Sequence, residues 1–186
     1  MKNTALVFSI VGILFFSPLS ILYALDIKLN NTPVQIFFSP QDDCTGTIVK
    51  EISKAKSSVQ IQAYAFTSEE IADSLIQAYS RGIAVEIILD KSNRSAKNGA
   101  ADIISQAGIP TYIDSRHAVA NNKVIIIDGG LLITGSFNFS KAAKEKNAEN
   151  LLVIRNKELA AIYLDNWTRH KEHSLRYGFT PSAKAR

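Results

Sequence analysis

The stretch that decides the fold runs from residue 121 to residue 150 and reads NNKVIIIDGGLLITGSFNFSKAAKEKNAEN. Two apolar runs, 123–127 and 131–134, are separated by an Asp-Gly-Gly sequence at 128–130, which predicts two strands joined by a tight hairpin turn. A third apolar run at 150–154 predicts another strand that is buried on both faces. Polar residues stand at the ends of these runs, so the same stretch that builds the sheet also delivers candidate functional groups to its edge.

The residues on either side of this stretch alternate between strand and helix patterns. Further strands are expected at 34–38, 59–66, 84–89 and 111–113, and helices at 47–56, 68–81, 99–107 and 157–171. The tail from Ser174 to Arg186 has no periodicity, and we expect it to be loose. Alternating strands and helices predict an α/β fold, a mixed β-sheet with helices on both faces, as a single domain over 25–186.

The N-terminus has the composition of a leader. Lys2 is followed by an uncharged, strongly apolar stretch that extends to Leu25, with the small residue Ala24 near its end. This pattern predicts a secretory signal peptide at 1–24 and an exported protein, periplasmic or secreted. The run is also about 20 residues long, enough to cross a bilayer, so an uncleaved membrane anchor is the alternative.

Composition narrows the function only slightly. With 46% apolar residues the chain can bury a real core, and 21 basic against 17 acidic residues give a net charge of +4, which is compatible with an anionic substrate. Cys44 is the only cysteine and is expected to be a small packed residue without an internal disulfide. No cysteine cluster or histidine pair shows the spacing of zinc ligands, so the sequence predicts no metal and no cofactor.

Polar side chains follow the strands of the 121–150 stretch. Lys123 opens one strand, whereas Ser136 and Asn138 follow another and alternate in register after Gly135. A lysine, a hydroxyl and a carboxamide beside backbone N–H groups form a suitable phosphate cradle. Each residue alone also has an ordinary explanation, and Asp128 in particular is the first residue of a turn dipeptide.

Taken together, these residues resemble the motif of the phospholipase D superfamily, His-x-Lys-x4-Asp-x6-Gly-Ser-x-Asn. This chain reads Asn121-x-Lys123-x4-Asp128-x6-Gly-Ser136-x-Asn138, so it matches at every position but the first. The resemblance covers essentially all of 25–186 and includes the segments 63–67, 81–82, 134–140 and 147–150, which are similar to small exported bacterial nucleases and phospholipase D-like proteins.

The resemblance implies a metal-independent phosphodiester hydrolysis in two steps. One histidine attacks phosphorus and forms a phosphohistidine, while the histidine of a second motif protonates the leaving oxygen. Lysine, serine and asparagine hold the phosphoryl oxygens, and Glu149 stands where the family has a glutamate that orients the histidine. Since this chain has one motif, the resemblance also implies a homodimer with the active site at the two-fold interface.

Asn121 departs from the motif at its first position, where the family has the catalytic histidine. A carboxamide is neither a nucleophile comparable to imidazole nor a proton donor near neutral pH, so we expect the chain to be inactive or severely impaired. His117 is an unfavourable substitute, because it lies about 13 Å upstream on an extended chain. The candidate site residues are Asn121, Lys123, Asp128, Ser136, Asn138 and Glu149.

Two alternatives to an inactivated hydrolase stay open. The chain could be a binding protein that holds a phosphodiester without cleaving it, or a structural partner of a histidine-bearing homologue. The substrate could be nucleic acid or phospholipid. A nuclease should carry a basic groove, and the sequence offers candidates for it, whereas no loop supplies an apolar lip for lipid, so the sequence favours nucleic acid. The groove candidates are Lys91, Arg94, Lys97, Lys141, Lys144 and Lys146.

Overall fold

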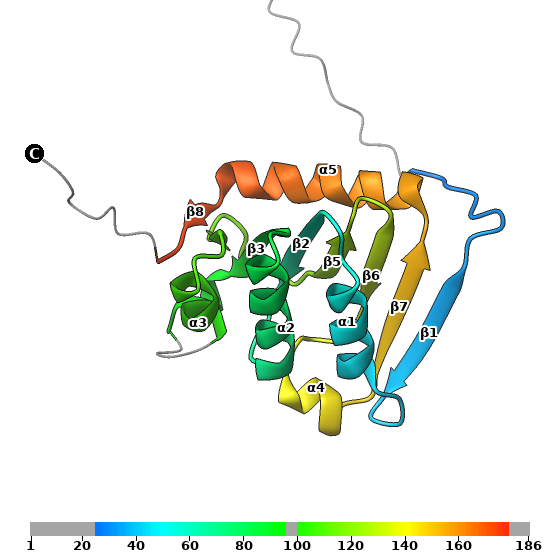
Figure 1. Cartoon of the computed structure of the whole chain (residues 1–186), viewed down its shortest axis with the longest axis horizontal. Helices are drawn as coiled ribbons and strands as arrows, with labels where there is room; N and C mark the ends of the chain where they lie inside the picture. The colour runs from blue at the N-terminus through cyan, green and yellow to red at the C-terminus, as the bar shows by residue number, and fades with distance from the viewer. Residues whose placement is uncertain (1–24, 96–99, 179–186) are drawn as a thin grey trace, which may run out of the picture.

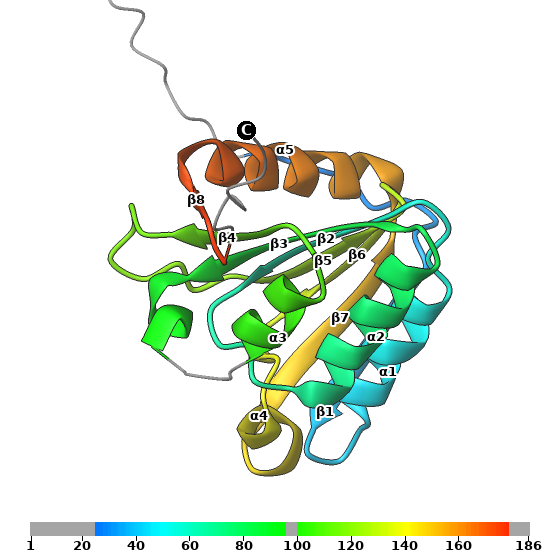
Figure 2. The same cartoon turned by 60° about the vertical axis from the view of Figure 1, so that its left-hand side comes forward.

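The computed structural model describes residues 25–95 and 100–178. They form one eight-stranded sheet with helices on both of its faces, as the sequence predicts (Figures 1 and 2). The leader predicted at 1–24 and the residue Lys97 lie outside the described residues, so export stays a prediction. Within the described part of the chain, no helix combines the length and the apolar character needed to cross a membrane.

The sheet has the strand order β1-β7-β6-β5-β2-β3-β4-β8. β2, β3 and β4 run parallel to one another, and every other neighbouring pair is antiparallel, which makes the sheet mixed. The strands are β1 Val34–Ser39, β2 Ser58–Ala63, β3 Ala84–Asp90, β4 Thr111–Asp114, β5 Lys123–Ile127, β6 Leu131–Gly135, β7 Glu149–Arg155 and β8 Leu175–Arg176.

Helices divide unequally between the two faces of the sheet. The helices α1, α2 and α3 lie on one face, whereas the long α5 crosses the other (Figure 2). The helices are α1 Cys44–Ser53, α2 Glu69–Ser80, α3 Ala100–Gln106, α4 Lys141–Glu145 and α5 Lys157–His173, with a 3-10 helix at Lys91–Ser95. Side-chain oxygens cap the starts of α1, α2, α4 and α5, which fixes where each helix begins.

Burial on both faces explains why the central strands read as continuous apolar runs. In β5, Ile125 and Ile127 join the larger core beneath α1 and α2, while Val124 and Ile126 join the smaller core beneath α5. Trp167 anchors α5 to the sheet through a 2.8 Å hydrogen bond from its Nε1 to the backbone oxygen of Ile61.

The structure corrects the sequence expectations in a few places. The tail is not loose throughout, because Leu175–Arg176 pairs with β4 and the backbone N–H of Tyr177 donates to Thr111. The short α4 and the 3-10 helix were also not expected. These are pieces of two to five residues whose contacts come from distant parts of the chain, and periodicity cannot show them. Cys44 is buried and free, as predicted.

Candidate functional site

The predicted motif residues gather where four strands of the sheet end. β5 begins at Lys123, β6 ends at Gly135 and β7 begins at Glu149. Antiparallel pairing therefore brings these three strand ends together at one edge of the sheet, the edge formed by the ends of the strands. β2 ends at the same edge, with Ala63 directly opposite Lys123. The loop before β5 adds Asn121, which is exposed.

Asn121 and Lys123 are in direct contact. The ammonium of Lys123 donates a hydrogen bond to the side-chain oxygen of Asn121 and a second one, of 3.2 Å, to its backbone oxygen. The same ammonium lies 5.5 Å from the centre of the Tyr64 ring, a cation–π contact. Burial lowers the pKa of Lys123 from its usual range, and the nearby charge of Glu149 opposes that shift. The Lys123 ammonium therefore contacts both Tyr64 and Asn121, and Asn121 stands where the motif has a histidine.

Ser136 is held by the start of β7. Its hydroxyl oxygen accepts hydrogen bonds from the backbone N–H of Asn150 at 3.0 Å and from the side-chain amide of Asn150 at 3.3 Å. In return, the N–H groups of Ser136 and Phe137 donate to the backbone oxygen of Asn150 at 3.1 and 3.2 Å. Gly135 makes this approach possible, since its φ is +151° and a Cβ there would stand 2.3 Å from the same oxygen.

Asn138 and Glu149 complete the group. The Asn138 side-chain oxygen is buried and has no hydrogen-bond partner among the described residues, so it is available to a further donor. Glu149 accepts a 3.0 Å hydrogen bond from the side chain of Asn147, whose backbone oxygen is in turn bound by Ser39. The sequence did not single out the positioning roles of Tyr64, Asn147 and Asn150; they depend on pairings between separate segments.

The structure does not bring Asp128 to this edge. Asp128 follows the last residue of β5, about 16 Å from Lys123 at the usual rise of a strand. Its carboxylate accepts hydrogen bonds from the backbone N–H groups of Lys56, Ser57 and Ser58 and from the Ser57 hydroxyl, at 2.7–3.1 Å. Its φ of 53° is one that Asp tolerates in a tight turn. These contacts indicate a structural role in place of the expected catalytic one.

Replacing Asp128 should therefore lower stability. Asp128→Asn keeps the turn conformation but removes the charge, and should cost about 1–3 kcal/mol, or roughly 2–12 °C in Tm. Burial tends to raise the pKa of Asp128, but the backbone hydrogen bonds outweigh it and lower the pKa. A lowered folded-state pKa means that the stabilisation is complete above the unfolded pKa of about 3.9 and is lost as pH falls below it.

Thermal unfolding followed by circular dichroism checks this prediction. The difference in Tm between the wild type and Asp128→Asn should be constant at neutral pH and should narrow below about pH 4. The control is Asp165→Asn, because the Asp165 side chain is exposed and its carboxylate forms a surface ion pair with Arg169. This substitution should change the free energy of unfolding by less than about 0.5 kcal/mol. Equal Tm values for wild type and Asp128→Asn would contradict the structural role.

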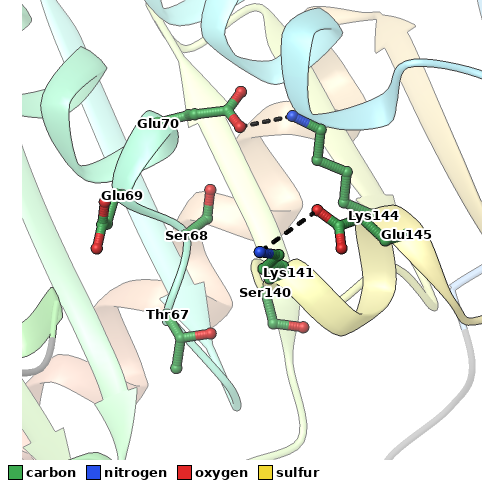
Figure 3. A pocket seen from close by; sticks show the side chains of 8 residues that line it. All are labelled: Thr67, Ser68, Glu69, Glu70, Ser140, Lys141, Lys144 and Glu145. Carbon is green, nitrogen blue, oxygen red and sulfur yellow. Dashed lines mark hydrogen bonds and ion pairs between the residues drawn. The ribbon is translucent and has the colours of Figure 1, made fainter.

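A hollow of about 300 Å³ lies near the site but does not contain it. Figure 3 shows the start of α2 facing α4 across this hollow, where Lys144 pairs with Glu70 at 2.5 Å and Lys141 lies 3.9 Å from Glu145. Ser68 and Ser140, which also line it, are occupied as helix caps. Two of the lysines expected in a basic groove thus have carboxylate partners here.

A third lysine of the expected groove also has a partner. Lys91 donates to the backbone oxygen of His117 at 3.1 Å. The ring of His117 is bound to Asp114, so it is held away from a role as substitute for the missing nucleophile.

The fold and the site define an α/β protein of the phospholipase D class, as the motif predicts. The model of the family described as "Cardiolipin synthase, PLD-like domain" matches residues 48–170, and the chain belongs to this phospholipase D-like family. It is 42% identical over 144 residues to "Phospholipase D" of Rickettsia conorii (strain ATCC VR-613 / Malish 7), covering 77% of this chain and 72% of that protein.

Solved structures agree with this assignment. The phospholipase D family member Nuc from Salmonella typhimurium is 36% identical, with a TM-score of 0.75, over 78% of this chain and 98% of that one. NucT from Helicobacter pylori is 27% identical, with a TM-score of 0.73, over 78% of this chain and 99% of that one. Both the family and the mixed α/β fold expected from the sequence are thereby confirmed.

Proposed function

We propose that this domain is a phosphodiesterase of the phospholipase D type whose hydrolysis is abolished or severely reduced by Asn121, and that it still binds phosphodiesters. The observation that carries the proposal is the contact between Asn121 and Lys123 at the edge of the sheet where the motif residues Ser136 and Asn138 also lie. The names of its relatives, phospholipase D among them, support the reaction class.

The chemistry at residue 121 explains the loss. Formation of a phosphohistidine requires an imidazole nitrogen with an available lone pair, and departure of the leaving oxygen requires a proton donor that titrates near neutral pH. The carboxamide of Asn121 supplies neither. Its oxygen is an acceptor that binds the Lys123 ammonium, so it also occupies a cation that a phosphoryl oxygen would otherwise bind.

A second copy of the chain is part of this proposal. The two-step hydrolysis needs two histidines, one as nucleophile and one as proton donor, each at the first position of a motif. One chain has one motif, and therefore one such position, residue 121. Asn121, Ser136 and Asn150 are exposed, as they must be to face a partner across a two-fold axis. Phe38, opposite Asn150 on the edge strand β1, is 56% exposed and would add apolar surface beside the site.

Binding gives a direct test of the cradle. The wild-type chain should bind a short single-stranded DNA, with affinity falling as salt rises. Lys123→Ala should weaken this binding by about 10-fold and lower the salt slope by about one, since it removes a phosphate contact. Calorimetry or fluorescence anisotropy over a series of salt concentrations measures both quantities.

Arg169→Ala is the matched control, because its side chain is 63% exposed and forms a surface ion pair with Asp165 on α5, outside both the motif group and the expected groove. Its effect on affinity should stay within about 2-fold, the range of a surface ion pair. Sedimentation with vesicles of anionic phospholipid tests the other class of phosphodiester. Binding to vesicles with none to DNA would assign the site to lipid, whereas binding to neither would contradict the proposal.

A further inference from the structure

All three histidines of the chain meet at one buried carboxylate. His117 belongs to the loop between β4 and β5, and His170 and His173 stand one turn apart at the end of α5. Their ring nitrogens lie 2.9, 2.9 and 3.3 Å from the same oxygen, Oδ2 of Asp114, whose side chain is fully buried at the end of β4. Residues separated by up to 59 positions in sequence thus form one compact group.

The distances within this group suit a tetrahedral ion. One ligand atom from each of the four side chains lies within 4.8 Å of all the others. A tetrahedral Zn²⁺ with ligand bonds of about 2.0 Å places neighbouring ligand atoms about 3.3 Å apart. The observed nitrogen–oxygen distances are at or slightly below that value, and all four atoms lie within 4.8 Å of one another, so small shifts of the rings would bring them to coordination distance.

Hydrogen bonding alone leaves the group poorly satisfied. The other oxygen of Asp114 already accepts from the backbone N–H groups of Arg116 and His117, at 3.0 and 3.4 Å, which fixes the carboxylate. Oδ2 then faces three imidazole nitrogens but has two lone pairs. The three rings also crowd one another, with centroids 4.9–5.3 Å apart, so they cannot all carry charge without repulsion. A cation at their centre satisfies all four groups.

We propose that Asp114, His117, His170 and His173 form a binding site for a divalent transition metal ion of the Zn²⁺ type. Three imidazoles and one carboxylate are donors that Zn²⁺ prefers, whereas Mg²⁺ and Ca²⁺ favour sites made of oxygen ligands. The side chain of His117 is 45% exposed, which gives the ion a path from solvent to the buried carboxylate. The sequence alone does not show this set, because Asp114, His117 and the end of α5 approach one another only in the fold.

Such an ion would act as a clamp. It would tie the end of α5 to the end of β4 and to the loop that leads to Asn121 (Figures 1 and 2). Two contacts already hold that loop: Lys91 binds the His117 backbone oxygen, and Asp90 accepts from the backbone N–H of Ala120 at 2.7 Å. The site is separate from the Lys123 and Ser136 group, so the proposal does not depend on the proposed function.

Metal binding to the full chain, purified without a histidine tag and freed of metal by chelator and dialysis, tests the proposal. Isothermal titration with ZnCl₂ should show one ion per chain with sub-micromolar affinity, and CoCl₂ should give the intense visible bands of tetrahedral Co²⁺. MgCl₂ and CaCl₂ should give neither. Zinc at 100 times its dissociation constant should raise Tm by about 5–10 °C.

Two variants separate this site from incidental zinc binding. His173→Gln removes one ligand with little change in size and should weaken zinc binding by at least about 100-fold and abolish the rise in Tm. His117→Ala changes the most exposed of the three histidines and should have the same effect on zinc binding and Tm. It provides the test if His173→Gln folds poorly. Glu172→Gln changes an exposed carboxylate on the same turn of α5, outside the ligand set, and should bind zinc as the wild type does. Absence of zinc binding by the wild type, or wild-type zinc affinity in both histidine variants, would overturn the proposal.

Discussion

Asn121→His is expected to turn this chain into an active phosphodiesterase, with turnover higher than that of the wild type by a factor on the order of 10⁶, the scale on which loss of a nucleophile reduces a hydrolase. The substitution supplies the one motif residue that is missing. The measurement is hydrolysis of bis(p-nitrophenyl) phosphate by wild type and variant at equal concentration of folded protein.

The geometry of the site favours this result. Residues 121 and 123 lie on the same side of the chain, as the contact between Asn121 and Lys123 shows, so a histidine at 121 would emerge beside the ammonium. Ser136 is held in place by the start of β7 and needs no rearrangement. Glu149 lies close enough to Lys123 to affect its pKa, and its carboxylate can receive the second ring N–H and fix the tautomer.

Asn121→Gln is the matched control, because it is closer to histidine in size but keeps the carboxamide, and it should stay as inactive as the wild type. A phosphohistidine trapped by denaturation without acid should appear only in the histidine variant. Turnover should not require Mg²⁺ or Ca²⁺. If the folded, dimeric histidine variant hydrolyses neither the nitrophenyl ester, nor DNA, nor phospholipid, the hydrolase assignment is wrong.

The sequence predicted the sheet well because its strands are buried on both faces or alternate cleanly. β3, β5 and β6 fall within a residue of their expected ends. By contrast, β8 is two residues long and depends on β4, a partner more than 60 positions away, so no local pattern could show it.

The candidate site was predicted unevenly, for a similar reason. Lys123, Ser136 and Asn138 were predicted because a fixed spacing relates them along the chain, and Glu149 because the family resemblance implies a glutamate there. The same spacing includes Asp128, which was expected at the site together with Lys123. Asp128 lies five residues further along the strand, so its side chain stands at the opposite edge of the sheet. The Asp114 cluster has no such spacing, since β4, a loop and α5 each supply part of it.

A dimer that contains one Asn121→His chain and one wild-type chain should be nearly inactive. In the proposed mechanism one histidine attacks phosphorus while the other protonates the leaving oxygen, and each comes from a different chain. A mixed dimer keeps one of the two roles. Loss of general acid catalysis should lower its turnover by a factor on the order of 10² to 10⁴ relative to the dimer with two histidines.

Two different peptide tags on co-expressed chains allow the mixed dimer to be purified, and sedimentation velocity at micromolar concentration establishes that it is a dimer. In a freely exchanging mixture, activity should follow the square of the fraction of histidine chains, because only pairs of such chains are active. In the proposed dimer, the exposed strand ends of the site and Phe38 on the edge strand β1 would lie at the interface. A monomer by sedimentation, or a mixed dimer with half the activity of the doubly substituted one, would mean that each chain acts alone, and the shared site would then have to be rejected.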